Sequence, residues 1–271
     1  MYERVTYENH NGERLEFGDG QGLYINENNL HNYAWSYTTT NDRIKKFYKS
    51  ITKFSLPIVV ACISDEDGVA IKNSLMEIAE KDIIAGEYGK LIIGDYYLSC
   101  YITESSKASY NKEKRFARVQ LTVVTDIPKW TKEETYVFRA TTVHLEGGID
   151  YPYDFTFDYG TSPAVTLYNN NFIESNFKII VYGVAGNVNL TIGENVYNIN
   201  TPIAQGEYVV IDSREKKAYL VGVTGEKTNV FSLRNRDYDL FAKIPSGINA
   251  INRNGWVDVT LYQERSEPLW T

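Results

Sequence analysis

Short strand-like runs recur along most of the chain, and residues that favour turns separate them. The run at residues 116–125 is representative, because Val119, Leu121 and Val123 occupy every second position and are expected to face one side of a sheet. Short strands at regular spacing with turn signals between them indicate a β-sandwich or a jelly roll. The sequence therefore predicts a mainly β protein.

The first of these runs predict a β-hairpin. Residues 4–7 and 14–17 flank Asn11 and Gly12, a dipeptide that supplies the two positive φ angles of a type I′ turn. The glycine-rich segment GDGQG, residues 18–22, is followed by LYINENN and not by a helix. Because a phosphate-binding loop has to open a helix, we interpret this segment as a turn.

One α-helix is predicted, from residue 68 to about residue 85. Asp65 or Asp67 is expected to cap its N-terminus, and Gly86 is expected to end it. The apolar residues recur with helical spacing and define one core-facing side, made of Ile71, Leu75, Ile78, Ala79 and Ile83.

The two halves of the chain differ in the elements they predict. Residues 1–145 carry the helix among strand-like runs, whereas residues 146–271 carry strand-like runs alone. We therefore expect an N-terminal β domain with one helix and, from about residue 163, a separate C-terminal β-sandwich. The strands expected in this second half are 177–182, 188–192, 196–199, 208–212, 219–223, 230–233, 241–244 and 257–262.

Residues 146–162 are expected to connect the two domains. They contain YPYDFTFDYG, residues 151–160, in which aromatic residues alternate with aspartates as they do along a strand. A proline at position 152 limits this strand to a sheet edge or to the entry of a sheet. The sequence predicts an ordered crossing with one apolar side, and we assign to it Tyr151, Pro152, Tyr153, Phe155 and Phe157.

Composition narrows the classes of function. A net charge of −7 disfavours binding to phosphate backbones. No apolar run is long enough for a signal peptide or a membrane span, so we expect the chain to fold in the cytoplasm.

Cys62 and Cys100 lack CxxC spacing and clustered histidines, which predicts reduced, buried thiols, no metal site and no cofactor. The 22 tyrosines favour a β protein with extensive protein interfaces.

The sequence contains no recognisable catalytic motif, and we expect no enzymatic activity. Its three histidines lie outside any nucleophile or metal motif. Asp154 and Asp158 are candidates for a glycosidase pair, but their spacing in sequence does not give their distance in space. A carbohydrate-binding sandwich is the more credible alternative. Its large aromatic faces are Trp35, Trp130, Trp256 and Trp270, each of which we expect to be packed in a core or an interface.

Several segments form a pattern through their order and spacing. The first half contains NHNGERLEFG near the start, YAWSYTTTNDRIKKF at residues 33–47, GKLIIGDYYLSCYITES after the helix, and VTDIPKW. The middle contains YPYDFTFDYG, and the second half contains FKIIVYG, LFAKIPSGINAI at residues 240–251, and YQERSEPLW. Together these segments resemble the distal tail (Dit) proteins of long-tailed siphophages and prophages, over most of the chain.

The resemblance implies a structural role in a virion. The N-terminal domain, a β-sandwich with a helix and an extended hairpin, is expected to close into a hexameric ring. The C-terminal domain is expected to be a galectin-like or jelly-roll β-sandwich. The implied partners are the tail-tube protein on one side of the ring, the tail-associated lysin or tip protein on the other, and receptor-binding or baseplate proteins around it. DNA would only pass through the central channel. The protein would lie at the distal tail tip of the virion, after assembly in the bacterial host cytoplasm.

The resemblance also implies where the ring contacts lie. One set is the stretch around residues 35–47, and the other is a hairpin between about Thr103 and Phe116. The residues assigned to these contacts are Trp35, Tyr37, Ile44, Phe47, Tyr110 and Phe116. Some related proteins carry inserted carbohydrate-binding modules, for which this chain has no room. Adsorption is therefore expected to depend on partner proteins.

Overall fold

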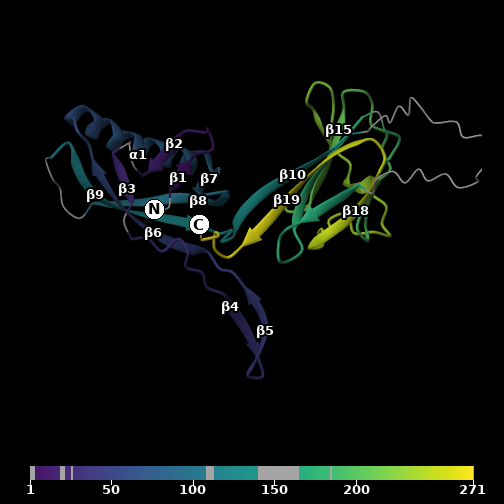
Figure 1. Ribbon diagram of the computed structural model, residues 1–271, viewed down its shortest axis with the longest axis horizontal. Coiled ribbons are helices and arrows are strands. Elements are labelled where there is room, and N and C mark those ends of the chain that lie inside the picture. Colours follow the sequence, from purple (N-terminus) through teal and green to yellow (C-terminus); the bar gives the residue numbers. More distant parts are fainter. Residues whose placement is uncertain are drawn as a thin grey trace, which may run out of the picture. The chain divides into compact units, whose positions relative to one another are not determined.

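Two compact units make up the chain in the computed structural model, which describes residues 4–18, 22–25, 27–107, 113–139, 165–183 and 185–270 (Figure 1). Unit 1 comprises Met1–Lys132 and Glu264–Thr271, and unit 2 comprises Glu133–Gln263. Antiparallel strands dominate the described residues of both units, and the predicted mainly β class is confirmed.

In unit 1 the long strand β8 joins two groups of strands. Its first half pairs with β7, which continues to β1 and β2, and its second half pairs with β9, which continues to β6 and β3. Both groups contribute to one apolar core, as in a β-sandwich. The strands are β1 (Val5–Glu8), β2 (Arg14–Phe17), β3 (Leu23–Ile25), β4 (Ser36–Thr40), β5 (Arg43–Tyr48), β6 (Thr52–Ala61), β7 (Gly89–Ile93), β8 (Tyr96–Lys107) and β9 (Phe116–Thr125).

The core of unit 1 follows the alternation visible in the sequence. Val119, Leu121 and Val123 of β9 are all at most 4% exposed, as predicted. Opposite them, alternate residues of β6 are buried in the same way, because the pleat sends every second side chain to one face. Trp130 is fully buried in this core. Its large apolar surface contributes to the free energy of folding of unit 1.

The predicted helix is present as α1 (Asp65–Ala85). Its N-cap is Ser64, whose hydroxyl accepts a hydrogen bond from the Asp67 backbone N–H, so the predicted aspartate caps are wrong. Gly86 ends the helix with a φ of 69°, as expected. Ile83 was assigned to the core-facing side but is 46% exposed. No helix among the described residues has the length and hydropathy to span a membrane.

The residue that takes the buried position on the last turn of α1 is Asp82. Its side chain is 0% exposed and accepts a hydrogen bond from the Tyr7 hydroxyl at 2.5 Å and another from the His10 backbone N–H at 2.9 Å. Burial, followed by the bond to Asp82, raises the pKa of Tyr7. A Cβ at Gly89 would lie 2.3 Å from both the Asp82 carboxylate and the Tyr7 hydroxyl, so this cluster requires a glycine there. The polar cluster therefore fixes α1 on strand β1.

The predicted first hairpin is confirmed, but its turn type is wrong. Gly12 has a φ of 82°, while Asn11 does not have a positive φ. The side chain of Asn9 accepts hydrogen bonds from the backbone N–H groups of Asn11 and Glu13, which supports a longer turn that ends in a bulge. This geometry places His10 beside Asp82.

Unit 2 is a sandwich of two antiparallel sheets. One sheet has the order β17-β16-β15-β12-β19-β10 and the other has the order β11-β18-β13-β14. Their inner faces share one core, in which Phe177 contacts Tyr197 edge to face at 4.9 Å. The strands are β10 (Trp130–Phe138), β11 (Thr166–Asn169), β12 (Asn176–Tyr182), β13 (Val188–Ile192), β14 (Asn195–Ile199), β15 (Tyr208–Asp212), β16 (Lys217–Val221), β17 (Lys227–Asn229), β18 (Gly247–Arg253) and β19 (Trp256–Arg265).

Two of the strands expected in unit 2 are not strands. Residues 230–233 contain the short 3-10 helix Phe231–Leu233, and in residues 241–244 only Ile244 forms a bridge, with Ser175. Leu240, Phe241 and Ile244 are buried nonetheless. These apolar residues lie in a loop and fill the core from there. Alternation of apolar and polar residues in the sequence does not distinguish such a loop from a short strand.

The boundary between the units differs from the one expected at residue 145. The first passage between the units lies within β10, after Lys132, and the second lies within β19, after Gln263. The polar run TKEE belongs to β10, where half-buried and exposed side chains alternate after the buried Thr131. Residues 264–270 were assigned to the C-terminal domain, but they belong to unit 1, where Glu264 binds Lys129 at 2.7 Å. The predicted crossing, residues 146–162 with Tyr151, Pro152, Tyr153, Phe155 and Phe157, lies outside the described residues.

Candidate assembly surface

Strands β4 and β5 form a hairpin that makes a two-stranded sheet of its own. Asn41 and Asp42 link the strands with φ angles of 50° and 60°, the backbone that a two-residue type I′ turn requires. Threonine, tyrosine and phenylalanine dominate the strands and favour the extended conformation. Figure 1 shows the hairpin extending away from the other strands of unit 1.

The register of this hairpin gives it two unlike faces. Tyr37 lies opposite Phe47, with ring centroids 6.4 Å apart, and Thr39 lies opposite Ile44. Because directly opposed residues share a face, Tyr37, Ile44 and Phe47 form one apolar face. The other face carries Lys46 and Arg43 opposite threonines, and a register shift between Thr38 and Thr39 leaves Lys45 without a direct partner across the hairpin.

The apolar face of the hairpin is open to solvent. Tyr37, Ile44 and Phe47 are 57%, 53% and 56% exposed. A two-stranded hairpin is only marginally stable on its own, and a contiguous exposed apolar face typically marks an interaction site. Three of the predicted ring-contact residues therefore lie together on a surface suited to protein binding.

The base of the hairpin is anchored to the rest of unit 1 through Lys49. Its ammonium group lies 5.2 Å from the centroid of the Trp35 ring and donates a hydrogen bond to the Pro128 carbonyl oxygen at 2.8 Å. Burial and, secondarily, the charge of Lys129 lower the pKa of Lys49 to about 8. Trp35, the fourth predicted contact in this stretch, is 50% exposed and lies at this base.

The second predicted contact region is built differently. Tyr110 lies outside the described residues, and Phe116 is half-buried at the start of β9. Lys72 of α1 donates hydrogen bonds to the carbonyl oxygens of Lys114 at 2.8 Å and Phe116 at 3.1 Å. Phe116 pairs with Ala61 at the far end of β6 from the β4–β5 hairpin, about 30 Å away along the strand. The structure therefore does not bring Phe116 together with Tyr37, Ile44 and Phe47.

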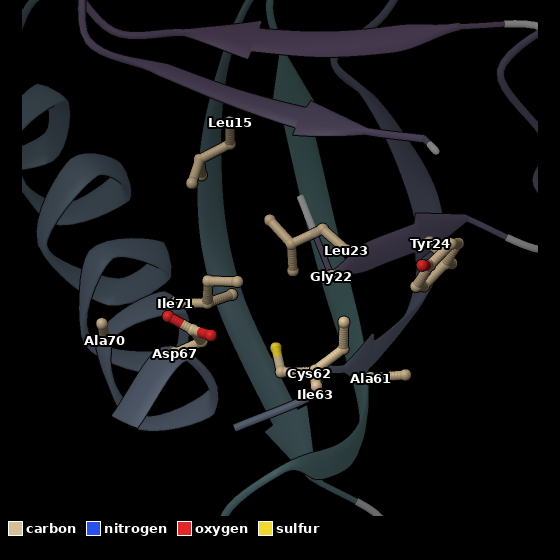
Figure 2. A pocket seen from close by; sticks show the side chains of 10 residues that line it. All are labelled: Leu15, Gly22, Leu23, Tyr24, Ala61, Cys62, Ile63, Asp67, Ala70 and Ile71. Atoms are coloured by element: carbon tan, nitrogen blue, oxygen red, sulfur yellow. The ribbon is translucent and has the colours of Figure 1, made fainter. Parts of the chain in front are cut away.

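A pocket of about 590 Å³ lies near this far end of β6, between the start of α1 and strands β2, β3 and β6 (Figure 2). Its lining is mostly aliphatic, with Leu15, Leu23 and Ile71 facing it and Asp67 as the charged member. Burial, followed by the charge of Asp67, raises the pKa of the Cys62 thiol, which lines the pocket and is therefore a poor nucleophile at neutral pH. Gly22, the last residue of the segment interpreted as a turn, lines the pocket, but the sequence of that segment did not indicate a cavity.

The remaining sequence candidates are dispersed over the molecule. Of the four tryptophans only Trp130 is buried, and Trp35, Trp256 and Trp270 are at least half exposed, so these three do not belong to the core of the single chain. Their packing in an interface stays a prediction. Cys100 is buried as predicted, and burial raises its pKa to about 12. Asp154 and Asp158 lie outside the described residues. The described ranges contain no group of three or more His, Cys, Asp or Glu side chains suited to a metal ion.

No family model and no curated protein sequence matches the chain. Solved structures do match it. The Dit (gp 19.1) protein of phage SPP1, described as a paradigm of the hub adsorption apparatus in phages that infect Gram-positive bacteria, aligns with a TM-score of 0.61 at 9% identity. That alignment covers 98% of this chain and 100% of the SPP1 protein.

This chain has the fold of a Dit hub protein. A second match supports the same conclusion: chains from the phage P2 baseplate in its activated conformation, solved with Ca or with Sr, align with a TM-score of 0.62 at 12% identity. These alignments cover 99% of this chain and 100% of the baseplate chain. The predicted resemblance to Dit proteins is thus confirmed at the level of the fold, over both units.

Proposed function

We propose that this chain is a structural subunit of a bacteriophage tail tip, in which six copies close into a hub ring. The observation that carries the proposal is the fold match, which extends over both units and over the full length of the SPP1 Dit protein. A shared single domain is compatible with many functions, whereas a match that covers two units in the same chain is more specific. The role assigned is assembly, with no enzymatic activity.

The exposed β4–β5 hairpin supports self-association. A ring is a closed heterologous assembly, so each copy needs two different surfaces that complement each other. The apolar face made of Tyr37, Ile44 and Phe47 provides one such surface, and aromatic residues at the centre of an interface typically contribute most of its binding energy.

The proposed partners of the ring follow from its place in a tail. The tail-tube protein would bind one side of the ring, the tail-associated lysin or tip protein would bind the other, and receptor-binding or baseplate proteins would bind around it. DNA would pass through the channel without being held, which is compatible with a net charge of −7. Assembly would take place in the host cytoplasm, and the mature location would be the distal tail tip.

A carbohydrate-binding sandwich is the second candidate. The observation in its favour is Trp256 of β19, which is 50% exposed and has the Arg139 guanidinium 5.7 Å from its ring centroid. An exposed aromatic ring beside a hydrogen-bond donor is suited to stacking on a sugar. This candidate predicts a monomer that binds glycans and loses the binding when Trp256 is replaced by alanine.

Light scattering on a size-exclusion column, over a series of protein concentrations, tests the first candidate. The expected mass is close to six times the 31.0 kDa of the chain, or twelve times for two stacked rings. Negative-stain images of the same fraction should show a ring with a central channel. A monomer at every concentration contradicts self-assembly, and glycan-array binding then decides whether the second candidate replaces it.

A further inference from the structure

The outer surface of α1 carries an apolar stripe that does not belong to the core. Val69, Met76 and Ile83 are 41%, 52% and 46% exposed. They recur every seven residues, so they line up along one side of a helix that has 3.6 residues per turn. The core-facing side of the same helix is made by Leu75 and Ala79. The helix therefore has a second apolar side, which the single chain leaves open.

Acidic residues border this stripe. Glu66, Glu77 and Glu80 are exposed, and among the described residues none of them forms an ion pair. The outer surface of α1 thus combines an apolar centre with unpaired negative charge. A partner that covers this surface is expected to be apolar and basic.

The β4–β5 hairpin has the complementary composition. The strand that carries Ile44 and Phe47 also carries Arg43, Lys45 and Lys46, of which Arg43 and Lys46 start from the other face of the hairpin. All three are exposed and form no ion pair with any other described residue. Long lysine side chains can reach around an apolar face and keep their charges at its edge. The two surfaces therefore match in both hydrophobicity and charge.

The two surfaces do not meet within one copy. Figure 1 shows α1 along one side of unit 1 and the β4–β5 hairpin extending from the opposite side. The helix packs on β8, β6 and β2, whereas the hairpin joins unit 1 at the Thr52 end of β6. Complementary patches on opposite sides of a subunit are the arrangement that a head-to-tail contact requires.

We infer that the apolar face of the β4–β5 hairpin of one copy docks on the outer surface of α1 in the next copy. Tyr37, Ile44 and Phe47 then cover Val69, Met76 and Ile83. Lys45 and Lys46 meet Glu77 and Glu80 at the edge of the contact. The inference rests on the proposed ring and adds to it the surface that receives the hairpin.

A charge exchange tests this contact. In one variant Lys45→Glu is combined with Lys46→Glu, in a second Glu77→Lys is combined with Glu80→Lys, and a third carries all four changes. Each pair alone puts like charges in the contact, so the protein concentration needed for half-maximal assembly should rise about tenfold or more. The four changes together restore opposite charges and should return assembly to near the wild-type concentration.

A matched control separates this effect from general charge repulsion. Lys227→Glu with Arg236→Glu changes two exposed cations of unit 2 and alters the net charge as much as the hairpin variant does. It should leave assembly unchanged. Thermal unfolding followed by circular dichroism should show the same midpoint for all variants, because the altered residues are exposed.

The outcomes distinguish this inference from the proposed function. If the wild type forms a ring and the helix variant forms it equally well, α1 does not receive the hairpin, and the inference is overturned while the hub proposal stands. If the wild type never assembles, both fail. A third outcome is that each pair of changes disrupts the ring and the four-change variant does not assemble again. This outcome also contradicts direct pairing between the hairpin lysines and the helix glutamates.

Cross-linking between copies provides an independent measurement. Ile44→Cys is placed in one batch of protein and Met76→Cys in another, both with Cys62→Ser, and the mixture is treated with a short bismaleimide. A cross-linked dimer is expected only in the mixture. Ile248→Cys, at a residue that is 77% exposed in unit 2, replaces Met76→Cys as the control. An intact ring without the hairpin–helix cross-link overturns the inference.

Discussion

The inner side of α1 and the β4–β5 hairpin belong to the same unit but are held in place by opposite means. The helix is fixed by buried polar groups, with Asp82 bound to Tyr7 and His10, and by Lys72, which binds backbone carbonyls before β9. The hairpin is anchored at its base by Lys49 and leaves its apolar face exposed. The comparison indicates that the first region maintains the fold, whereas the second is available for a partner.

Removal of the buried carboxylate is expected to have the largest effect. Asp82→Ala leaves the Tyr7 hydroxyl and the His10 N–H without their acceptor in a buried site. The free energy of unfolding should fall by about 3 kcal/mol. Urea denaturation followed by circular dichroism measures this change. Glu80→Ala, on the exposed side of the same helix, should change stability by less than about 0.5 kcal/mol. Equal effects of the two variants would contradict the anchoring role of Asp82.

Truncation of the hairpin face is expected to separate assembly from stability. Tyr37→Ala with Phe47→Ala removes two exposed rings, so the folding free energy should change by at most about 1 kcal/mol. Assembly should weaken by about 2 kcal/mol per interface, or roughly thirtyfold in concentration. Light scattering and thermal unfolding of the same samples report the two quantities. A large loss of stability with an intact ring would show that the face serves the fold.

A smaller effect is expected where α1 contacts the segment before β9. A Cβ at Gly68 would lie 2.3 Å from the Lys114 carbonyl oxygen, which is backbone and cannot move aside easily. Gly68→Ala should therefore lower the free energy of unfolding by about 1.5 kcal/mol, despite the better helix propensity of alanine. Asn73→Ala, at an exposed position of the same helix, is the control and should be neutral or slightly stabilising. Chemical denaturation of both variants checks the comparison.

The pH dependence of the hairpin base is expected to be the smallest effect. Lys49 has a folded-state pKa of about 8, below its ordinary value of 10.5. Between about pH 8 and pH 10.5 this residue therefore binds more protons in the unfolded chain than in the folded chain. Stability contributed by this residue should therefore rise as pH increases from about 8 to about 10.5. Lys49→Met should lack this rise when unfolding is compared across that range. A direct titration of the Lys49 side chain by NMR with a midpoint near 10.5 would contradict the buried base.

Much of the fold could be predicted because it depends on local patterns. The period-two burial of Val119, Leu121 and Val123 follows from the pleat of a strand, and the end of α1 at Gly86 follows from its left-handed backbone. In the candidate surface, the resemblance assigned Tyr37, Ile44 and Phe47 to the ring contacts. The structure places these three residues together on an exposed face, and their role in a ring stays a prediction. Phe116 was assigned to a second contact set, and β6 separates it from the β4–β5 hairpin.

Long-range contacts decided the rest. Nothing near Asp82 in the sequence indicates that Tyr7 and His10, more than 70 residues away, will satisfy a buried carboxylate there. The return of residues 264–270 to unit 1 likewise depends on the Lys129–Glu264 pair and on the course of β19 through both units. Alternation and capping are properties of neighbouring residues, so the sequence alone determines them. Burial of a polar group and the limits of a unit depend on which distant segments pack together, so only the tertiary structure determines them.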